Sequence, residues 1–83
     1  MKFRARVEVG LKLGHSDPEG ETTRQSLVEL NYRVSKVGVS KVYEIEFEAM
    51  NQREAKKTLD EMCKRLLANP VKDNYRIEIE ETR

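Results

Sequence analysis

The sequence predicts one small α+β domain, because stretches that alternate apolar and polar residues are interspersed with two stretches that begin with helix caps. Its 83 residues are enough for one hydrophobic core and no more. A hydrophobic content of 37%, with two prolines and four glycines, is typical of a folded chain. We therefore expect residues 1–83 to form a single domain, with self-association adding buried surface to a small core.

The first predicted element is a strand over residues 2–13. Apolar side chains occupy every second position, and mainly charged residues lie between them. A period of two indicates a strand with one buried face. The strand ends at Gly14-His15-Ser16, and its apolar residues are Phe3, Ala5, Val7, Val9, Leu11 and Leu13.

A short helix is predicted next. Asp17 followed by Pro18 indicates an N-cap and a proline at the first helical position. Gly20 weakens the first turn, and Asn31 is a suitable C-terminal stop. The apolar stripe is narrow and consists of Leu27, Val28 and Leu30.

Residues 32–49 predict two strands joined by a turn at Ser40-Lys41. Such a hairpin would leave an apolar patch on the solvent side of the sheet, formed by Val37, Val39 and Val42. Alternatively, a bulge near residues 35–36 would turn one of these valines inward. The pattern does not decide between the two.

A second helix and a last strand complete the chain. Asn51 and Glu54 form a capping-box pattern, and Asn69-Pro70 ends the helix. The helix has an inner stripe of Ala55, Leu59, Met62 and Leu66, with Cys63 and Leu67 alongside. In the last strand Tyr75, Ile77 and Ile79 alternate with charged residues.

This order of elements, β-α-β-β-α-β, predicts the ferredoxin-like arrangement, a four-stranded antiparallel sheet with two helices on one face. Charge supports the spatial order. The solvent side of the first strand is basic, whereas those of the third and last strands are mainly acidic. A basic row between two acidic rows gives favourable cross-strand pairs.

Composition argues against several classes of partner. The net charge of +1 gives no general attraction to polyanions. The aromatic residues of the first and third strands point toward the helices, so they cannot stack nucleic-acid bases on the open sheet face. The N-terminus is unlike a signal peptide, and no apolar run reaches membrane-spanning length. We expect a cytoplasmic protein that binds neither nucleic acid nor membrane.

Catalytic or metal-binding residues are not evident. His15 and Asp17 could form an acid–base pair, but a solvated histidine beside a helix cap explains them better. Cys63 lies among apolar residues of a helix, which favours a buried, inert thiol. One histidine and one cysteine far apart in sequence do not make a metal site. We expect no catalytic, cofactor-binding or metal-binding residues in this chain.

Several segments resemble the PurS family, the small subunit of phosphoribosylformylglycinamidine (FGAM) synthase. The segments that carry the resemblance are 62–71, with its Asn-Pro-Val turn, Tyr75-Arg76-Ile77-Glu78, and the start, from Ala5-Arg6-Val7 to Asp17-Pro18-Glu19-Gly20. Residues 32–49 are similar to the family's middle hairpin. The resemblance covers essentially the whole chain.

The resemblance implies a non-catalytic adaptor in purine biosynthesis. Such a subunit forms a homodimer or tetramer and bridges a glutaminase subunit (PurQ) and a large synthetase subunit (PurL). It would support ammonia transfer between them, while the complex uses ATP, Mg and glutamine. We hypothesise self-association through Val37, Val39 and Val42, and partner contacts through two loops. The loop residues are Gly14, His15 and Asp17, and Asn69, Pro70 and Val71. The alternative is a stand-alone regulatory module that binds a small metabolite.

Overall fold

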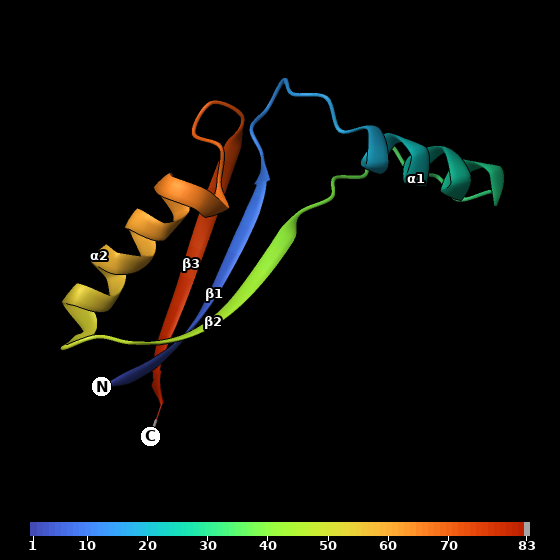
Figure 1. The fold of residues 1–83 in the computed structure, drawn as a ribbon. Coiled ribbons are helices and arrows are strands. Elements are labelled where there is room, and N and C mark those ends of the chain that lie inside the picture. The colour runs from blue at the N-terminus through green and yellow to red at the C-terminus, as the bar shows by residue number, and fades with distance from the viewer. Residues whose placement is uncertain (83) are drawn as a thin grey trace.

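The structure, a computed structural model, describes residues 1–82 and contains one antiparallel sheet with strand order β2-β1-β3. In Figure 1, helix α2 lies along the sheet, whereas helix α1 points away from it. The elements in chain order are β1 (Lys2–Leu11), α1 (Pro18–Glu29), β2 (Lys41–Glu48), α2 (Gln52–Met62), the π-helix η1 (Cys63–Leu67) and β3 (Asp73–Thr82).

Strand β1 supplies much of the buried core, as its alternation predicts. Its register places Ala5 level with Ile45 of β2 and Ile79 of β3, and both neighbours pair with β1 antiparallel. The strand ends at Leu11, two residues earlier than expected, and Leu13 is exposed. The side of the sheet that α2 covers is called the inner face, and its buried β1 residues are Phe3, Ala5, Val7 and Val9.

Helix α2 begins where its sequence predicts. The Asn51 side chain accepts a hydrogen bond from the backbone N–H of Glu54 at 2.8 Å and caps the helix. The Glu54 carboxylate accepts from the N–H of Met50 at 3.3 Å rather than from that of Asn51, so the expected capping box is displaced by one residue. The side chains that α2 and η1 bury are Ala55, Leu59 and Cys63.

The end of this helix differs from the predicted apolar stripe. In η1 the N–H of Ala68 donates to the carbonyl of Cys63, five residues earlier, at 2.9 Å. The wider turn rotates the following side chains about the helix axis. Leu66, expected on the inner stripe, is 84% exposed, and Leu67 is half-buried. The prediction for Leu66 is therefore wrong.

The predicted four-stranded sheet is also wrong for the part of the chain that the structure describes. Residues 32–40 form no strand, so three strands stand where four were expected. The hairpin turn at Ser40-Lys41 is not formed, because β2 itself begins at Lys41. Helix α1 forms as predicted but does not share the inner face with α2 (Figure 1).

Local contacts explain why residues 32–40 stay with α1. Asn31 has a φ of 72°, and its N–H and that of Tyr32 donate to carbonyls of the last helical turn. This left-handed stop reverses the chain, which then runs back along α1 (Figure 1). It passes so close to Gly20 that a Cβ there would lie 2.3 Å from the carbonyl oxygen of Val37.

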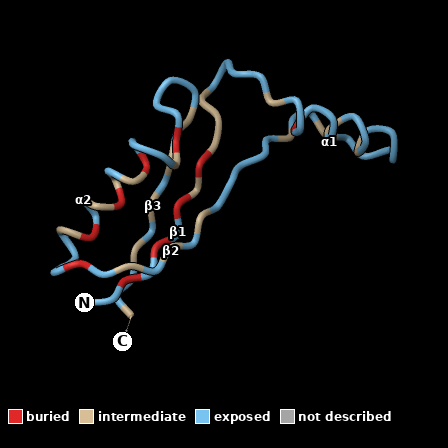
Figure 2. The backbone as a smooth tube through the Cα atoms, viewed as in Figure 1, coloured by how far each residue is buried: buried red, intermediate tan, exposed pale blue. Residues whose placement is uncertain are grey.

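Residues 12–40, called the arm below, make the molecule elongated. The Cα radius of gyration is 16.4 Å, with extents of 51 × 28 × 14 Å. A compact chain of this length has a radius of gyration of about 12 Å. Figure 2 shows the buried residues concentrated in the sheet and α2. Of the arm's residues, all of which the structure describes, only Gly20 is buried.

Candidate functional site

The two loops predicted to contact partners meet at one end of the sheet. The end of β1 lies beside the start of β3, which brings the loops together. The backbone N–H of Lys12 donates to the carbonyl oxygen of Lys72 at 2.7 Å, and its Nζ donates to that of Pro70 at 2.9 Å. Residues 12–17 and 68–72 are called the apex loops below.

The second apex loop is organised by Asn69. Its side-chain oxygen accepts from the N–H of Val71 at 2.9 Å, and its own N–H donates to the Asp73 carboxylate at 2.9 Å. The carbonyl of Asn69 also accepts from the N–H of Asp73 at 2.8 Å. These bonds fix the Asn-Pro turn without any partner and hold Val71, 75% exposed, in the loop.

The first apex loop presents Leu13 and His15 to solvent. Leu13 is 90% exposed, more than any other large apolar side chain in residues 1–82. The next residue, Gly14, has a φ of 87°, a conformation that favours glycine. The N–H of His15 closes the turn by donating to the carbonyl of Lys12 at 3.3 Å.

Asp17 commits both carboxylate oxygens to the backbone of the arm. Oδ1 accepts from the N–H of Gly20 and Oδ2 from the N–H of Val39, each at 2.9 Å. The hydrogen bonds from Gly20 and then Val39 lower the pKa of Asp17. The predicted helix cap is confirmed, and the bond to Val39 also closes the base of the arm. This geometry does not support an acid–base pair with His15.

The three valines predicted to form a patch do not share one face of the sheet. Val37 is half-buried beside α1, and Val39 follows it in the returning segment with 36% exposure. Val42 lies on β2 opposite Glu8 and is 41% exposed. The predicted patch on the sheet is not formed, because the hairpin that would have brought the three valines together is not formed. A role of these valines in self-association stays a prediction.

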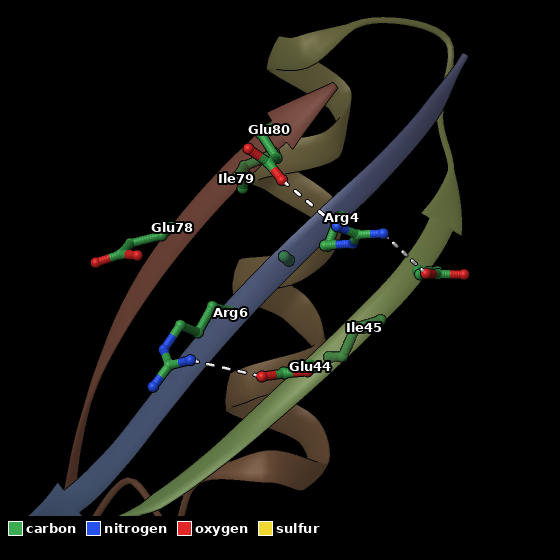
Figure 3. A pocket seen from close by; sticks show the side chains of 9 residues that line it. Arg4, Arg6, Glu44, Ile45, Glu78, Ile79 and Glu80 are labelled. Carbon is green, nitrogen blue, oxygen red and sulfur yellow. Dashed lines mark hydrogen bonds and ion pairs between the residues drawn. The ribbon is translucent and has the colours of Figure 1, made fainter. Parts of the chain in front are cut away.

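The outer face of the sheet, opposite α2, is covered by ion pairs (Figure 3). Arg4 lies between Glu46 and Glu80, with N···O distances of 3.4 and 3.8 Å, and Arg6 lies 3.5 Å from Glu44. The predicted basic row flanked by acidic rows is confirmed. These glutamates therefore have arginine partners, and the exposed pairs contribute little to stability.

Aromatic residues of the sheet lie on the inner face, as predicted. Phe3 is 1% exposed, Phe47 is half-buried, and their ring centroids are 5.8 Å apart. Within residues 1–82, no group of three or more His, Cys, Asp or Glu side chains is placed to hold a metal ion. In the same residues, no helix has the length and apolar character needed to cross a membrane.

Comparison with known proteins identifies the family. Residues 4–81 match the family model described as PurS: Phosphoribosylformylglycinamidine (FGAM) synthase. The chain belongs to the PurS family. The family that the sequence resembles over essentially its whole length is thereby confirmed.

Curated PurS proteins are similar over nearly their whole length. The FGAM synthase subunit PurS of Archaeoglobus fulgidus is 47% identical over 74 residues, which cover 88% of this chain and 92% of the relative. The PurS subunit of Methanocaldococcus jannaschii is 39% identical over 79 residues, covering 94% and 95%.

Solved PurS structures have a similar fold over nearly the whole chain. Thermus thermophilus PurS has a TM-score of 0.87 and 37% identity, with 100% of both chains covered. The M. jannaschii protein, described as a subunit of formylglycinamide ribonucleotide amidotransferase in the purine biosynthetic pathway, has a TM-score of 0.84, 36% identity and coverage of 98% and 99%. A chain of PurLQS from Thermotoga maritima has a TM-score of 0.87, 30% identity and coverage of 96% and 99%.

One cluster in this PurS-family chain was not anticipated from the sequence. The Tyr75 hydroxyl donates to Oδ1 of Asp60, and Nζ of Lys64 lies 2.8 Å from Oδ2. Hydrogen bonds from Lys64 and Tyr75 lower the pKa of Asp60. Only the four-residue spacing of Asp60 and Lys64 could have signalled it. The cluster fastens the end of α2 to β3.

The single thiol lies beneath this cluster and is not a reactive site. Cys63 is fully buried. Its burial, and then the charge of Asp60, raises the pKa of the Cys63 thiol. Nucleophilic cysteines require exposure and a lowered pKa. The predicted assignment of Cys63 to the core is confirmed.

Proposed function

We propose that this chain is a non-catalytic adaptor of the FGAM synthase complex in purine biosynthesis. It holds a glutaminase subunit (PurQ) and a large synthetase subunit (PurL) together and supports ammonia transfer between them. The likeness to a chain of PurLQS from T. maritima carries the proposal, because it spans 96% of this chain. In this role the chain binds the two larger subunits, and those subunits carry out the catalysed reactions.

The apex loops are the surface that we assign to the larger subunits. They combine exposed apolar side chains, Leu13 and Val71, with a backbone fixed by Lys12 and Asn69. Rigid loops with exposed apolar side chains bind with little loss of conformational entropy. His15 adds a polar group at the same end of the sheet.

Self-association is the second part of the proposal. The chain forms a homodimer or a tetramer, with Val37, Val39 and Val42 near the contact. Exposed parts of Val39 and Val42, at the junction of the arm and β2, support this assignment.

The adaptor itself binds no cofactor in this proposal. ATP, Mg and glutamine are used by the synthetase and glutaminase subunits, in the cytoplasm where purine precursors are made. The side chains that could have suggested a site are otherwise engaged: Asp17 caps a helix and Cys63 is buried.

Assembly of the three purified subunits tests the adaptor role. Size-exclusion chromatography should give a complex containing all three only when this chain is present. Leu13→Asp with Val71→Asp should abolish that complex while the chain keeps its melting temperature. Met50→Asp is the matched control, because Met50 is 74% exposed but lies by the opposite end of the sheet. Assembly of the apex variant at wild-type strength would reject the apex loops as the contact.

A further inference from the structure

The end of α2 lies beside the start of β3 (Figure 1), and three polar side chains join them. The Tyr75 hydroxyl donates to Oδ1 of Asp60, and Nζ of Lys64 lies 2.8 Å from Oδ2 of Asp60. These three residues are called the clamp below. Because Asp60 and Tyr75 are 15 positions apart, the clamp closes residues 60–75 into a loop that contains η1 and the second apex loop.

Inside that loop, η1 sets the direction in which the second apex loop points. The N–H of Ala68 donates to the carbonyl of Cys63, a spacing one residue wider than in an α-helix. If this bond moved to the carbonyl of Lys64, the turn would become α-helical, and the chain after it would rotate by roughly 100° about the helix axis. Single π-helical turns are rare and are frequently found at functional sites. Only the π-helical form of the turn gives the observed apex.

The tip of the second apex loop is rigid in itself but does not fix its own direction. The N–H of Asn69 donates to the Asp73 carboxylate at 2.9 Å, and the carbonyl of Asn69 accepts from the N–H of Asp73 at 2.8 Å. Both bonds lie within five residues, so they are compatible with a rotation of the whole tip. Lys12 holds the β3 side of the tip through the carbonyls of Pro70 and Lys72. The α2 side is held through η1.

We propose that the clamp positions the second apex loop for binding of the larger subunits, by holding η1 in its π-helical form. Tyr75 joins the two elements, because it is half-buried and is fixed in the sheet opposite Val9 of β1. Asp60 is held by Tyr75, and Lys64, the second residue of η1, is held by Asp60. This inference rests on the proposed function and assigns a positioning role to residues outside the apex loops.

Folding of this end of the molecule does not depend on the clamp. Leu59 and Cys63 are fully buried and Ala68 is 7% exposed, so apolar contacts already hold α2 and η1 on the sheet. The ion pair of the clamp joins side chains that are 44% and 64% exposed, and such pairs contribute little to stability. Loss of the clamp should therefore change the direction of the loop more than the stability of the fold.

Binding measurements on the complete complex test the positioning role. Tyr75→Phe keeps the ring and removes only the hydroxyl. It should raise the Kd for the glutaminase and synthetase subunits about tenfold, because binding must then order the loop. Asp60→Ala should have the same effect, and combining the two changes should add nothing further. Asp60→Asn keeps an acceptor for Tyr75 and should bind within about threefold of the wild type.

Hydrogen exchange of the Ala68 N–H reports on the π-helical turn directly, because this N–H makes the bond to Cys63. Its exchange should become about tenfold faster in Tyr75→Phe. Ile77→Val is the matched control, since it trims the core two residues farther along β3 and leaves the clamp intact. The control should change neither the exchange rate nor the Kd by more than about threefold.

The outcomes separate this inference from the proposed function. If the wild-type chain does not assemble with the two subunits, both are rejected. If it assembles and Tyr75→Phe binds equally well, or if Ile77→Val loses as much binding as Tyr75→Phe, only the role of the clamp is rejected. Unchanged Ala68 exchange in Tyr75→Phe would also reject it.

Discussion

Asp17 and Asn69 are polar residues of the apex loops whose side chains accept hydrogen bonds from the backbone. Asp17 accepts hydrogen bonds from Gly20 and Val39, and Asn69 accepts one from Val71. Both look like site residues in the sequence, because short polar side chains beside proline are common at functional loops. Their role in this chain is to fix the loops that present Leu13 and Val71.

The burial of Cys63 predicts an unreactive thiol. Its exposure is 0% and burial raises its pKa, so little accessible thiolate exists at pH 8. Labelling with a thiol reagent should be at least about a hundredfold slower in the native protein than in urea. The unfolded chain provides the reference rate. Native labelling at that rate would contradict the buried position.

Truncation of Leu59 should be strongly destabilising. Leu59 is fully buried between α2 and β1, so Leu59→Ala should lower the free energy of unfolding by about 2–5 kcal/mol. Leu66→Ala is the control, and because Leu66 is 84% exposed its effect should stay within about 0.5 kcal/mol. Urea denaturation measures both, and equal effects would contradict the π-helical rotation of Leu66 out of the core.

At the scale of elements, the arm depends on a glycine that helix propensity alone would disfavour. Gly20→Ala should gain about 1 kcal/mol from propensity. Instead we expect destabilisation, since the new Cβ would lie 2.3 Å from the Val37 carbonyl oxygen. Gly38→Ala meets no atom within 4 Å and should be neutral or stabilising. Thermal melting, with amide exchange at Val39, compares the two, and a higher melting temperature for Gly20→Ala would refute the close packing.

The arm should also respond to acid through Asp17. Hydrogen bonds from Gly20 and Val39 hold the folded pKa of Asp17 below the unfolded value, which is about 3.9. The ionised carboxylate therefore stabilises the arm at neutral pH, and this contribution is lost as the pH falls from about 4 through the lower folded pKa. Amide chemical shifts of Gly20 and Val39 should titrate below pH 3.9, and Asp17→Asn should remove the titration. A midpoint at or above 3.9 would contradict the two bonds.

The elements that the sequence predicts correctly are those with a local cause. Strict alternation predicts β1 and β3, and the caps at Asp17 and Asn51 predict the start of each helix. Residues 32–40 carry a strand-like pattern, but whether they pair with β2 or pack on α1 depends on distant contacts. The bond from Val39 to Asp17 spans 22 residues and leaves no trace in local pattern.

In the candidate site, too, the sequence predicts one feature correctly and another wrongly. The meeting of the apex loops follows from antiparallel pairing of the first and last strands, which the charge rows already indicated. The valine patch depended on a hairpin turn at Ser40-Lys41, and no glycine or asparagine there favoured that turn. The prediction of the valine patch was therefore wrong because the hairpin turn on which it depended had little support in the sequence.

At the scale of the whole molecule, the shape is itself an argument for assembly. The radius of gyration is 16.4 Å, and only one residue of the arm is buried, so much of this elongated chain is open to contact by other proteins. The sheet with α2 forms the core, the apex loops face outward at one end, and the arm projects from that end (Figure 1). Such a molecule can contact a second copy and larger subunits with different surfaces.

The most direct measurement compares glutamine-dependent with ammonia-dependent FGAM formation by the glutaminase and synthetase subunits, with and without this chain. An adaptor that supports ammonia transfer should be required for the glutamine-dependent reaction and matter much less when ammonia is supplied. If omission of the chain leaves the ratio of the two activities unchanged, the adaptor account is wrong.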